Sequence, residues 1–434
     1  MQAAGSRDLM LLAPLVLPVD GPPIVHGAVL IRGDRIIEVG PEAEVSASSQ
    51  NASHEWLEAS VIVPGFVNAH AHLELSAMGG QISRPADCEE DFTGWIRRVL
   101  RIREGWDAST YTGSTRQGCR YLLESGCTTV GDISSNGLNL GPLVASPLRA
   151  VAFREVLGFG PEAAVRAQAS LKEWFALREE IHSASDGRVS LGISPHAPYS
   201  TSSGIYRSCA DLATRHGCLL TTHVSETLEE LEFTRTGAGA FRDLLTMRGI
   251  LPADLDVPGV SPVAYLQRLG VLDCAGPGAH LNYLLPGDLE ILAACRMKPV
   301  YCPQSHLFFG RRDHPAPQLL ASGIPLALGT DSLASNSNLQ MLAEMRAARA
   351  LHPSVSPSIW LRCATLHGAA ALGMQDEIGS LTPGKKADLA VILLDPEAEM
   401  RSAGRGVRSE RCDGYCAPSR LKTHFPARGV RSEK

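Results

Sequence analysis

The sequence predicts an α/β protein in which a (β/α)8 TIM-type barrel is inserted into a small β-sandwich domain. Short apolar runs alternate with longer amphipathic stretches such as ASLKEWFALREEI, a pattern typical of βα units around a parallel sheet. Eight such runs can be counted, and eight parallel strands close a barrel. Strand-like runs broken by Gly and Asp flank this pattern on both sides, which indicates one small β domain built from both chain ends.

The N-terminal part of the small β domain is expected over residues 1–63. Its runs LMLLAPLVL, GAVLIRGDRIIEVG and ASVIVPG have the length and punctuation of hairpin strands. The first apolar run, residues 9–19, lacks a basic leader, contains Pro14 and Pro18, and is too short to cross a bilayer. We therefore expect a strand there rather than a signal peptide or a membrane span.

The barrel is expected over residues 64–365, with the run of its first strand beginning slightly earlier. Each candidate strand is an apolar run that ends in polar residues. The eight candidates are residues 61–72, 127–133, 149–156, 189–196, 218–226, 276–282, 298–304 and 324–332.

The C-terminal part of the small β domain is expected over residues 366–395, where GSLTPGKKADLAVILL returns to short strands. Residues 396–434 are rich in Arg, Gly and Ser without helical or strand periodicity, so we expect an irregular basic tail. Cys412 and Cys416 in this tail lack a second ligand pair, which makes them weak candidates for metal binding.

The charge and cysteine content of the chain indicate which kinds of molecule it is expected to bind and in which compartment. A net charge of −6 and a pI near 6.2 provide no broad cationic field, so we expect a small-molecule substrate rather than nucleic acid or a membrane. The 11 cysteines are odd in number and follow no paired spacing, which indicates reduced thiols in a cytoplasmic protein. We also expect a homo-oligomer, a dimer or larger.

The strongest local signal for chemistry is His70-Ala71-His72 at the end of an apolar strand. The two-residue period of a strand points both imidazoles to one side. His223 and Asp331 also follow predicted strands, at the end where barrels place their active sites. Three histidines and a carboxylate suit one divalent ion, Zn in preference and Fe as the alternative, which would polarise water as the nucleophile. An isolated HxH pair would more often be structural.

Other candidate residues depend on this metal context. Glu226 lies three residues after His223 and is placed to act as a proton shuttle, although a glutamate at a helix N-terminus gives the same pattern. His280 and His196 follow strands and are candidates for stabilising the attacking oxygen and contacting substrate, with a structural role as the alternative. Further candidate substrate contacts are Trp95, Glu104 and His306.

A negative observation favours one metal ion over two. Binuclear barrels often use a carboxylated lysine as a bridge between their ions. Between His72 and His223 the only lysine is Lys172, which lies in the amphipathic ASLKEWFALREEI stretch and not at the end of a strand.

From about Asp8 to Leu394 the chain resembles the amidohydrolase superfamily, in its mononuclear branch of cytosine, guanine and S-adenosylhomocysteine/methylthioadenosine deaminases and triazine chlorohydrolases. The matching segments, in order, are VIVPGFVNAHAHLEL, ESGCTTVGD, SPHAPYS, THVSE, GTDSLASN and ATLHGAAALG with IGSLTPGKKADLAVI. The resemblance implies metal ligands at His70, His72, His223 and Asp331, a proton shuttle at Glu226, transition-state stabilisation by His280 and Asp331, and a substrate contact at His196.

Within that branch the chain looks most like adenosine-type deaminases, including aminodeoxyfutalosine deaminases. This implies hydrolytic deamination of a 6-aminopurine nucleoside derivative with release of ammonia. A guanine or cytosine-type deaminase and a triazine-type chlorohydrolase or N-dealkylase are alternatives that keep the site. A non-catalytic scaffold is the remote alternative, since scaffolds of this family lose ligands and all four are present here.

Three departures from the family pattern bear on this assignment. The family's ribose-holding carboxylate has only an approximate match in Glu104. The segment AFRDLLTMRGILPADLDVPG, between His223 and His280, is longer than expected and should shape the pocket. The tail has no returning valine-rich strand with Asn-Gly-Arg, so the small β domain is expected to lack a strand.

Overall fold

The computed structural model describes residues 8–48, 51–84, 91–252, 255–394 and 421–424. The chain divides into a smaller unit of residues 1–66, 124–128 and 376–434 and a larger unit of residues 67–123 and 129–375. The larger unit therefore extends beyond the expected boundary at residue 365. The boundary lies later in the chain because residues Leu366–Ala371 form a helix that packs within the larger unit. Gly368 in this helix lies so close to Val67 that a Cβ there would meet the valine at 2.9 Å.

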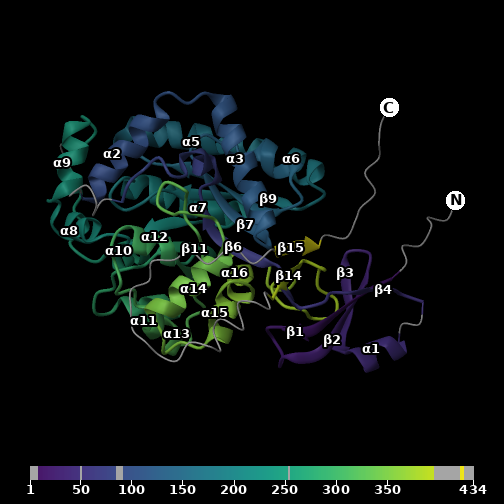
Figure 1. The fold of residues 1–434 in the computed structure, drawn as a ribbon. Helices are drawn as coiled ribbons and strands as arrows, with labels where there is room; N and C mark the ends of the chain where they lie inside the picture. Colours follow the sequence, from purple (N-terminus) through teal and green to yellow (C-terminus); the bar gives the residue numbers. More distant parts are fainter. Residues whose placement is uncertain (1–7, 49–50, 85–90, 253–254, 395–420, 425–434) are drawn as a thin grey trace. The chain divides into compact units, whose positions relative to one another are not determined.

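The smaller unit contains one seven-stranded sheet. Its order is β15-β14-β5-β1-β2-β3, and β4 pairs with β1. Strands from both ends of the chain meet in it, because β14 runs antiparallel to β5. Figure 1 shows β1, β2 and β3 with helix α1 beside them. The elements are β1 (Leu9–Val16), β2 (Ile24–Arg32), β3 (Arg35–Pro41), α1 (Glu42–Ser48), β4 (Ser53–Trp56), β5 (Ser60–Pro64), β14 (Leu389–Leu393) and β15 (Leu421–His424).

Both faces of this sheet are covered, so its strands read as nearly continuous apolar runs. Met10 and Leu12 point to the face where Val45 of α1 packs. Leu11 and Ala13 point to the opposite face, where Leu381 from the loop before β14 packs. The described strands form a single sheet, and the expected sandwich of two sheets is not observed among them.

The expectation that no strand returns to this sheet after β14 is wrong over Leu421–His424. This segment, β15, runs antiparallel to β14 along the edge that β5 leaves open. Four residues are too few to show a periodicity, whereas an open strand edge offers unpaired backbone groups to any extended segment. Cys412 and Cys416 lie outside the described residues.

The larger unit contains two four-stranded sheets, ordered β6-β7-β8-β9 and β10-β11-β12-β13. Pairing is parallel from β7 to β9 and from β10 to β13. Single parallel bridges, Ile193 with Leu220 and Ala71 with Asp331, connect the sheets at both edges. The strands are β6 (Phe66–Ala71), β7 (Cys127–Ser134), β8 (Arg149–Val156), β9 (Val189–Pro195), β10 (Thr222–Val224), β11 (Gly276–His280), β12 (Met297–Tyr301) and β13 (Ala327–Leu328).

Each of the eight predicted runs overlaps one of these strands, but the lengths differ. The run 61–72 is two strands, β5 and β6, separated at Gly65, where a Cβ would lie 2.3 Å from the Thr128 hydroxyl. The runs 218–226 and 324–332 shorten to three and two strand residues. Their remaining residues form the loops that carry polar side chains at the strand ends.

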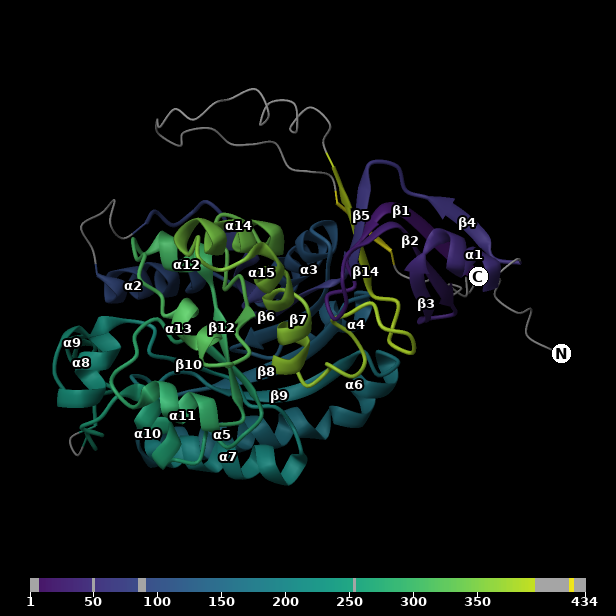
Figure 2. The same cartoon turned by 90° about the horizontal axis from the view of Figure 1, so that it is seen from below.

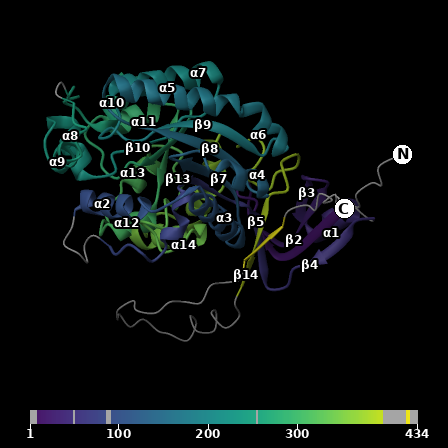
Figure 3. The same ribbon diagram turned by 90° about the horizontal axis from the view of Figure 1, so that it is seen from above.

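Helices surround the two sheets, and Figures 2 and 3 show α5 and α7 lying along β9. None of the helices within the described residues is long and apolar enough to span a membrane. The helices are η1 (Leu73–Met78), α2 (Phe92–Arg103), α3 (Ala108–Glu124), α4 (Leu140–Ala145), α5 (Gly160–Ala176), α6 (Arg178–Ala184), α7 (Ser203–His216), α8 (Leu228–Thr236), α9 (Ala240–Met247), α10 (Pro262–Arg268), α11 (Asp288–Ala294), α12 (Pro303–Phe308), α13 (Ala316–Ala321), α14 (Met341–Leu351), α15 (Pro357–Cys363) and α16 (Leu366–Ala371).

The start of α8 shows how the sequence defines an element next to the predicted site. The Thr227 hydroxyl accepts a hydrogen bond from the Glu230 amide, and Gly237, with φ of 67°, ends the helix. Both are the expected capping residues. They set the position of Glu226 immediately before the first turn.

Candidate active site

The four predicted metal ligands converge at the ends of three strands. His70 lies in β6, His72 follows that strand directly, His223 lies in β10, and Asp331 follows β13. The Nε2 atoms of His72 and His223 lie 3.1 Å apart. Asp331 Oδ1 lies 3.8 Å from His70 Nε2 and 3.9 Å from His72 Nε2. One ligand atom from each of the three histidines falls within 4.8 Å of the others. This spacing allows the three histidines to share one ion, with Asp331 beside two of them.

The protonation states of these histidines also fit a divalent cation. His70 is buried, and neither of its ring nitrogens has a hydrogen-bond partner among the described residues. Burial, followed by the neighbouring imidazoles, holds the pKa of His70 and of His72 well below the usual value. Burial lowers the pKa of His223 to about 4. Neutral imidazoles with unshared lone pairs are what a metal ion requires, and a cation would satisfy His70.

Neighbouring groups orient two of the ligands. His223 Nδ1–H donates to the carbonyl of His196 at 3.0 Å, which leaves its Nε2 lone pair for the cluster. Asp331 Oδ2 accepts from Ser305 Oγ at 2.9 Å and from Ser335 Oγ at 2.6 Å, so Oδ1 faces the histidines. Burial raises the pKa of Asp331 to about 6, against the opposing effect of the two serines.

Strained backbone marks the same region. His280, Leu281, Ser225 and Asp331 have φ values of 76°, 53°, 51° and 56°, in the left-handed region that non-glycine residues usually avoid. Each such residue costs about 1–2 kcal/mol. Strain of this kind persists where surrounding contacts require it, and it often occurs at functional sites.

Glu226 and His280 lie next to the histidine cluster. Glu226 Oε1 is 3.8 Å from His280 Nε2, and both side chains are buried. The Glu226 amide donates to Glu230 Oε2 at 2.7 Å, while its carbonyl accepts from Asn282 Nδ2 at 2.9 Å. Burial raises the pKa of the Glu226 carboxyl well above its usual value. Such a carboxyl holds a proton more readily than an exposed one, which suits a general acid-base group.

These residues lie in a pocket of about 260 Å³. The predicted site residues that line it are His72, Trp95, His196, His223, Glu226, His280 and Asp331. Three residues that were not predicted also line it, namely Glu74, Arg103 and Glu155. His70 lies behind them within the cluster. No lysine is among the lining residues, and Lys172 lies on α5 beside a different surface hollow.

Glu155, at the end of β8, is the most informative of the missed residues. One oxygen of its carboxylate lies within 4.8 Å of a ring nitrogen of His196 and of one of His223. This triad is not a second metal centre, because Nδ1 of His223 is bound to the His196 carbonyl and its Nε2 faces His72. The Glu155 side chain makes no hydrogen bond among the described residues. Its position at the end of a predicted strand was a signal that could have identified it.

Two predicted substrate contacts do not reach the pocket. Glu104 is exposed at the C-cap of α2, because the helical period directs Val99, Leu100 and Arg103 toward the pocket and turns residue 104 away. His306 is buried, but its ring packs edge-on against Tyr301 and His314 instead of lining the pocket. The carboxylates that do line the pocket, besides Glu226 and Asp331, are Glu74 and Glu155.

Glu74 is already engaged by its neighbours. Its carboxylate accepts from Ser134 Oγ at 2.7 Å and from Ser135 Oγ at 2.6 Å, and it lies 3.4 Å from the Arg103 guanidinium.

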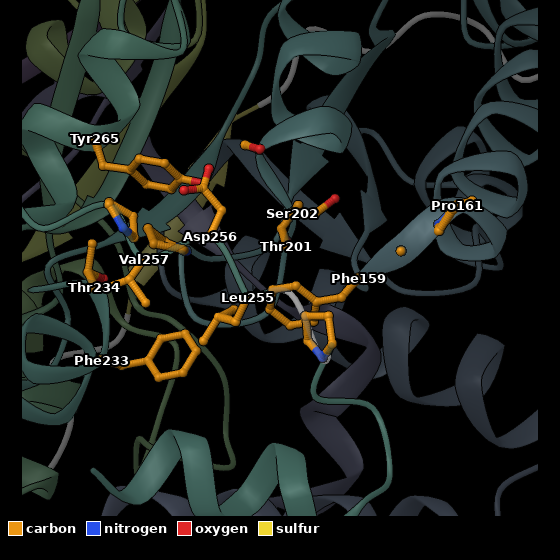
Figure 4. A pocket seen from close by; sticks show the side chains of 15 residues that line it. Phe159, Pro161, Thr201, Ser202, Phe233, Thr234, Leu255, Asp256, Val257 and Tyr265 are labelled. Carbon is orange, nitrogen blue, oxygen red and sulfur yellow. The ribbon is translucent and has the colours of Figure 1, made fainter. Parts of the chain in front are cut away.

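A second hollow, also of about 260 Å³, contains none of the predicted site residues. Figure 4 shows Phe159, Leu255 and Tyr265 around it. The histidine-lined pocket is therefore the candidate active site.

This arrangement of candidate metal ligands at strand ends is typical of metal-dependent hydrolases of the amidohydrolase class. The chain belongs to the amidohydrolase family, whose model matches residues 61–410. A model of an imidazolonepropionase-like composite domain of bacteria matches residues 27–48.

Two relatives narrow the comparison within that family. The chain is 31% identical to a 5-methylthioadenosine/S-adenosylhomocysteine deaminase of Pelotomaculum thermopropionicum, over 89% of this chain and 84% of that protein. A crystal structure of Helicobacter pylori aminofutalosine deaminase in complex with methylthio-coformycin is 26% identical, with a TM-score of 0.78 over 89% of this chain and 92% of that one.

A third comparison concerns the fold alone. A zinc-bound adenosine deaminase from Xanthomonas campestris is 24% identical, with a TM-score of 0.74 over 90% of this chain and 86% of that one.

Proposed function

We propose that this protein is a metal-dependent aminohydrolase that deaminates a 6-aminopurine nucleoside derivative and releases ammonia. The observation that carries the proposal is the convergence of His70, His72, His223 and Asp331 beside the buried Glu226. Relatives named as deaminases of adenosine derivatives support the same chemistry. We further infer that the two four-stranded sheets close as a (β/α)8 barrel, supported by the bridges at both edges.

His70, His72, His223 and Asp331 would hold one divalent ion, Zn in preference to Fe, because nitrogen donors with one carboxylate suit it. When bound, this ion lowers the pKa of a water molecule so that it can attack near neutral pH. The ligands' own task is to remain deprotonated. Burial does this for the histidines, and the serines at Asp331 Oδ2 favour the carboxylate form there.

Glu226 would move the protons in this reaction. Its raised pKa suits a carboxyl that accepts a proton from the attacking water and passes it to a ring nitrogen. Glu226 would then take the second proton, from the new hydroxyl on the ring carbon, and give it to the amino group, which leaves as ammonia. His280, 3.8 Å from Glu226 and buried, would donate a hydrogen bond to the new oxygen on the ring carbon. Asp331 would help to orient that oxygen.

His196 and Glu155 would bind the nucleoside beyond the reacting carbon. His196 shares a hydrogen bond with Ser200 Oγ through Nδ1, at 2.6 Å, so its Nε2 is available to a ring nitrogen. Glu155, next to it and without a hydrogen bond, is suited to accept from a sugar hydroxyl. Glu155 would therefore take the role expected of Glu104. Trp95 of α2 lines the pocket and is held by a hydrogen bond to the Ala334 carbonyl, so it would contact the substrate from that side of the pocket.

The test is ammonia release by the zinc-loaded protein from a panel of substrates. The panel contains adenosine, 5′-deoxyadenosine, 5′-methylthioadenosine, guanine, cytosine and a chlorotriazine. We expect turnover of the 6-aminopurine nucleosides. Preferred turnover of guanine or cytosine, or chloride release from the triazine, would support an alternative leaving group or ring. Absence of turnover for every compound would exclude the proposal.

A further inference from the structure

One short segment donates hydrogen bonds to the backbone of both residues that are proposed to act on the protons and on the new oxygen. The segment comprises residues 311–314, between α12 and α13, which Figure 2 labels. Arg311 Nη1–H donates to the carbonyl oxygen of Glu226 at 2.9 Å. His314 Nε2–H donates to the carbonyl oxygen of His280, also at 2.9 Å. A carbonyl oxygen can only accept, so Nε2 of His314 carries the proton in this contact.

Both carbonyls belong to unusual stretches of backbone. His280 has a φ of 76°, and Ser225, directly before Glu226, has a φ of 51°. Left-handed backbone is unfavourable for non-glycine residues and persists where surrounding contacts require it. A hydrogen bond to each carbonyl restricts the rotation of its peptide group. These contacts therefore help to fix two side chains whose facing atoms, Glu226 Oε1 and His280 Nε2, lie 3.8 Å apart.

Aromatic neighbours hold the two donors in place. The His314 ring is buried, stacks on Tyr301 with centroids 3.7 Å apart, and meets His306 edge-on at 5.8 Å. The Arg311 guanidinium lies over the Phe309 ring, 4.8 Å from its centroid. The Arg311 amide donates to the His306 carbonyl at 3.1 Å, which connects the segment to α12. His306, which does not line the pocket, is thus part of the packing around the segment.

Neither Arg311 nor His314 is among the residues that line the pocket. Their printed hydrogen bonds to the site end on backbone carbonyls and not on groups that face a substrate. An influence of either residue on the reaction must therefore pass through the residue whose carbonyl it binds.

On the basis of the proposed function, we propose that Arg311 and His314 are positioning residues, which hold Glu226 and His280 for proton transfer and for stabilisation of the new oxygen. A displacement of reacting groups by about 1 Å costs on the order of 10²-fold in rate. Two side chains outside the pocket lining thus control turnover without contacting the substrate.

His314 provides the cleaner test of the two. Burial raises the pKa of Glu226 and the charge of Arg311 opposes this rise, so loss of Arg311 changes more than a position. The Glu226 carbonyl also keeps a second donor, Asn282 Nδ2 at 2.9 Å. His314, in contrast, is neutral, because burial holds its pKa well below the usual value. Its removal takes away a hydrogen bond without removing a charge.

The test uses the zinc-loaded protein and the nucleoside of the panel that the wild-type protein deaminates fastest. His314→Leu removes the donor, and kcat should fall by roughly 10–100-fold while KM and bound metal stay within about twofold. His314→Gln places an amide N–H near the position of Nε2–H and should keep kcat within about threefold of wild type. Arg312→Gln, at the exposed position between the two donors, is the matched control and should keep full activity.

A double-mutant cycle separates positioning from a general loss of structure. His280→Asn removes the imidazole that His314 is proposed to position, and asparagine tolerates left-handed backbone. In this background, His314→Leu should lower the remaining kcat by less than about threefold. A merely structural defect would lower kcat by the same factor in both backgrounds. If His314→Leu does not fold, the same cycle is made with Arg311→Met in the Glu226→Gln background.

The outcomes are distinct. Wild-type kcat in a folded His314→Leu protein, failure of His314→Gln to recover kcat, or equal losses in both backgrounds would overturn this inference alone. Failure of the wild-type protein to deaminate any nucleoside of the panel would overturn the proposed function, and with it this inference.

Discussion

The Nε2 atoms of His72 and His223 lie 3.1 Å apart, although 151 residues separate the two histidines. Burial keeps the pKa of each ring low, so both imidazoles are neutral at neutral pH. The Nδ1–H of His223 donates to the His196 carbonyl, so the Nε2 atom of His223 carries a lone pair that faces His72. This geometry supports the proposal that the two Nε2 atoms share one metal ion.

The first prediction concerns this ion. His223→Asn should lower the bound metal from about one ion per chain to a small fraction and reduce deamination on the order of 10³-fold, because the activated water is lost. Metal analysis and an ammonia assay on the same preparation measure both. The matched control is His182→Asn, an exposed position on α6, which should keep metal and activity. A His223→Asn protein with full metal content and activity would contradict the assigned centre.

The second prediction separates proton transfer from metal binding. Glu226→Gln keeps the size of the side chain but removes the proton-accepting group. We expect kcat to fall by roughly 10²–10⁴-fold while metal content is unchanged. Glu229→Gln, in the first turn of α8, serves as the control and should retain activity. Retention of turnover in the Glu226 variant would mean that another group moves the proton.

The third prediction concerns recognition of the sugar. If Glu155 accepts from a ribose hydroxyl, the wild-type protein should prefer adenosine over 2′-deoxyadenosine by roughly 10–100-fold in kcat/KM, the effect of one hydrogen bond to a charged group. Glu155→Gln should bring the two substrates within a few-fold of each other. Glu173→Gln on the exposed side of α5 is the control. An unchanged preference in the Glu155 variant would assign the hydroxyl to another residue.

The fourth prediction concerns pH and stability. Asp132 is buried and accepts from the Leu73 amide and from Asn139 Nδ2, both at 2.8 Å. Burial raises its pKa to about 7. Between about pH 4 and 7 the folded protein therefore holds a proton that the unfolded chain has lost, so the contribution of Asp132 to stability falls as pH rises through this window.

Asp132→Asn should make the decline shallower by at most about 1.4 kcal/mol per pH unit. The new amide can be accommodated, because within the described part of the chain Asn139 Oδ1 has no hydrogen-bond partner and can accept from it when the Asn139 amide turns over. Urea unfolding at pH 5, 6, 7 and 8 measures the slope. Asp211→Asn, exposed on α7, should leave the slope unchanged. An equal slope in the wild-type and Asp132 proteins would show that this carboxyl ionises alike in both states.

Local pattern was sufficient to select the candidate metal ligands. His70 lies near the end of β6 and His72 directly follows that strand, so period-two geometry predicts that their side chains point the same way. His223, Asp331, His196 and His280 each follow an apolar run, and the structure brings all of them to one pocket or to the cluster beside it. The resemblance to the amidohydrolases, made on these segments, is confirmed by the family match.

Local sequence pattern did not predict which side chains of a helix face the pocket or how the helices pack. Glu104 and Arg103 are neighbours in the sequence, yet one turns to solvent while the other lines the pocket. His306 follows a strand as the other histidines do, but α12 rotates it against Tyr301. The serines that orient Asp331 lie 26 residues before it and 4 after it, and no spacing rule identifies them.

The sequence by itself thus determined the strand runs and the four candidate ligand residues at their ends, because these depend on short-range backbone geometry. It also determined the family, because the matching segments can be identified along the chain. Only the tertiary structure decided which carboxylates reach the pocket, that α2 and α9 contribute to its lining, and that β15 pairs with β14. The physical reason is that a cavity or a strand edge is defined by groups far apart in the chain, whose meeting depends on how whole elements pack and not on their own periodicity.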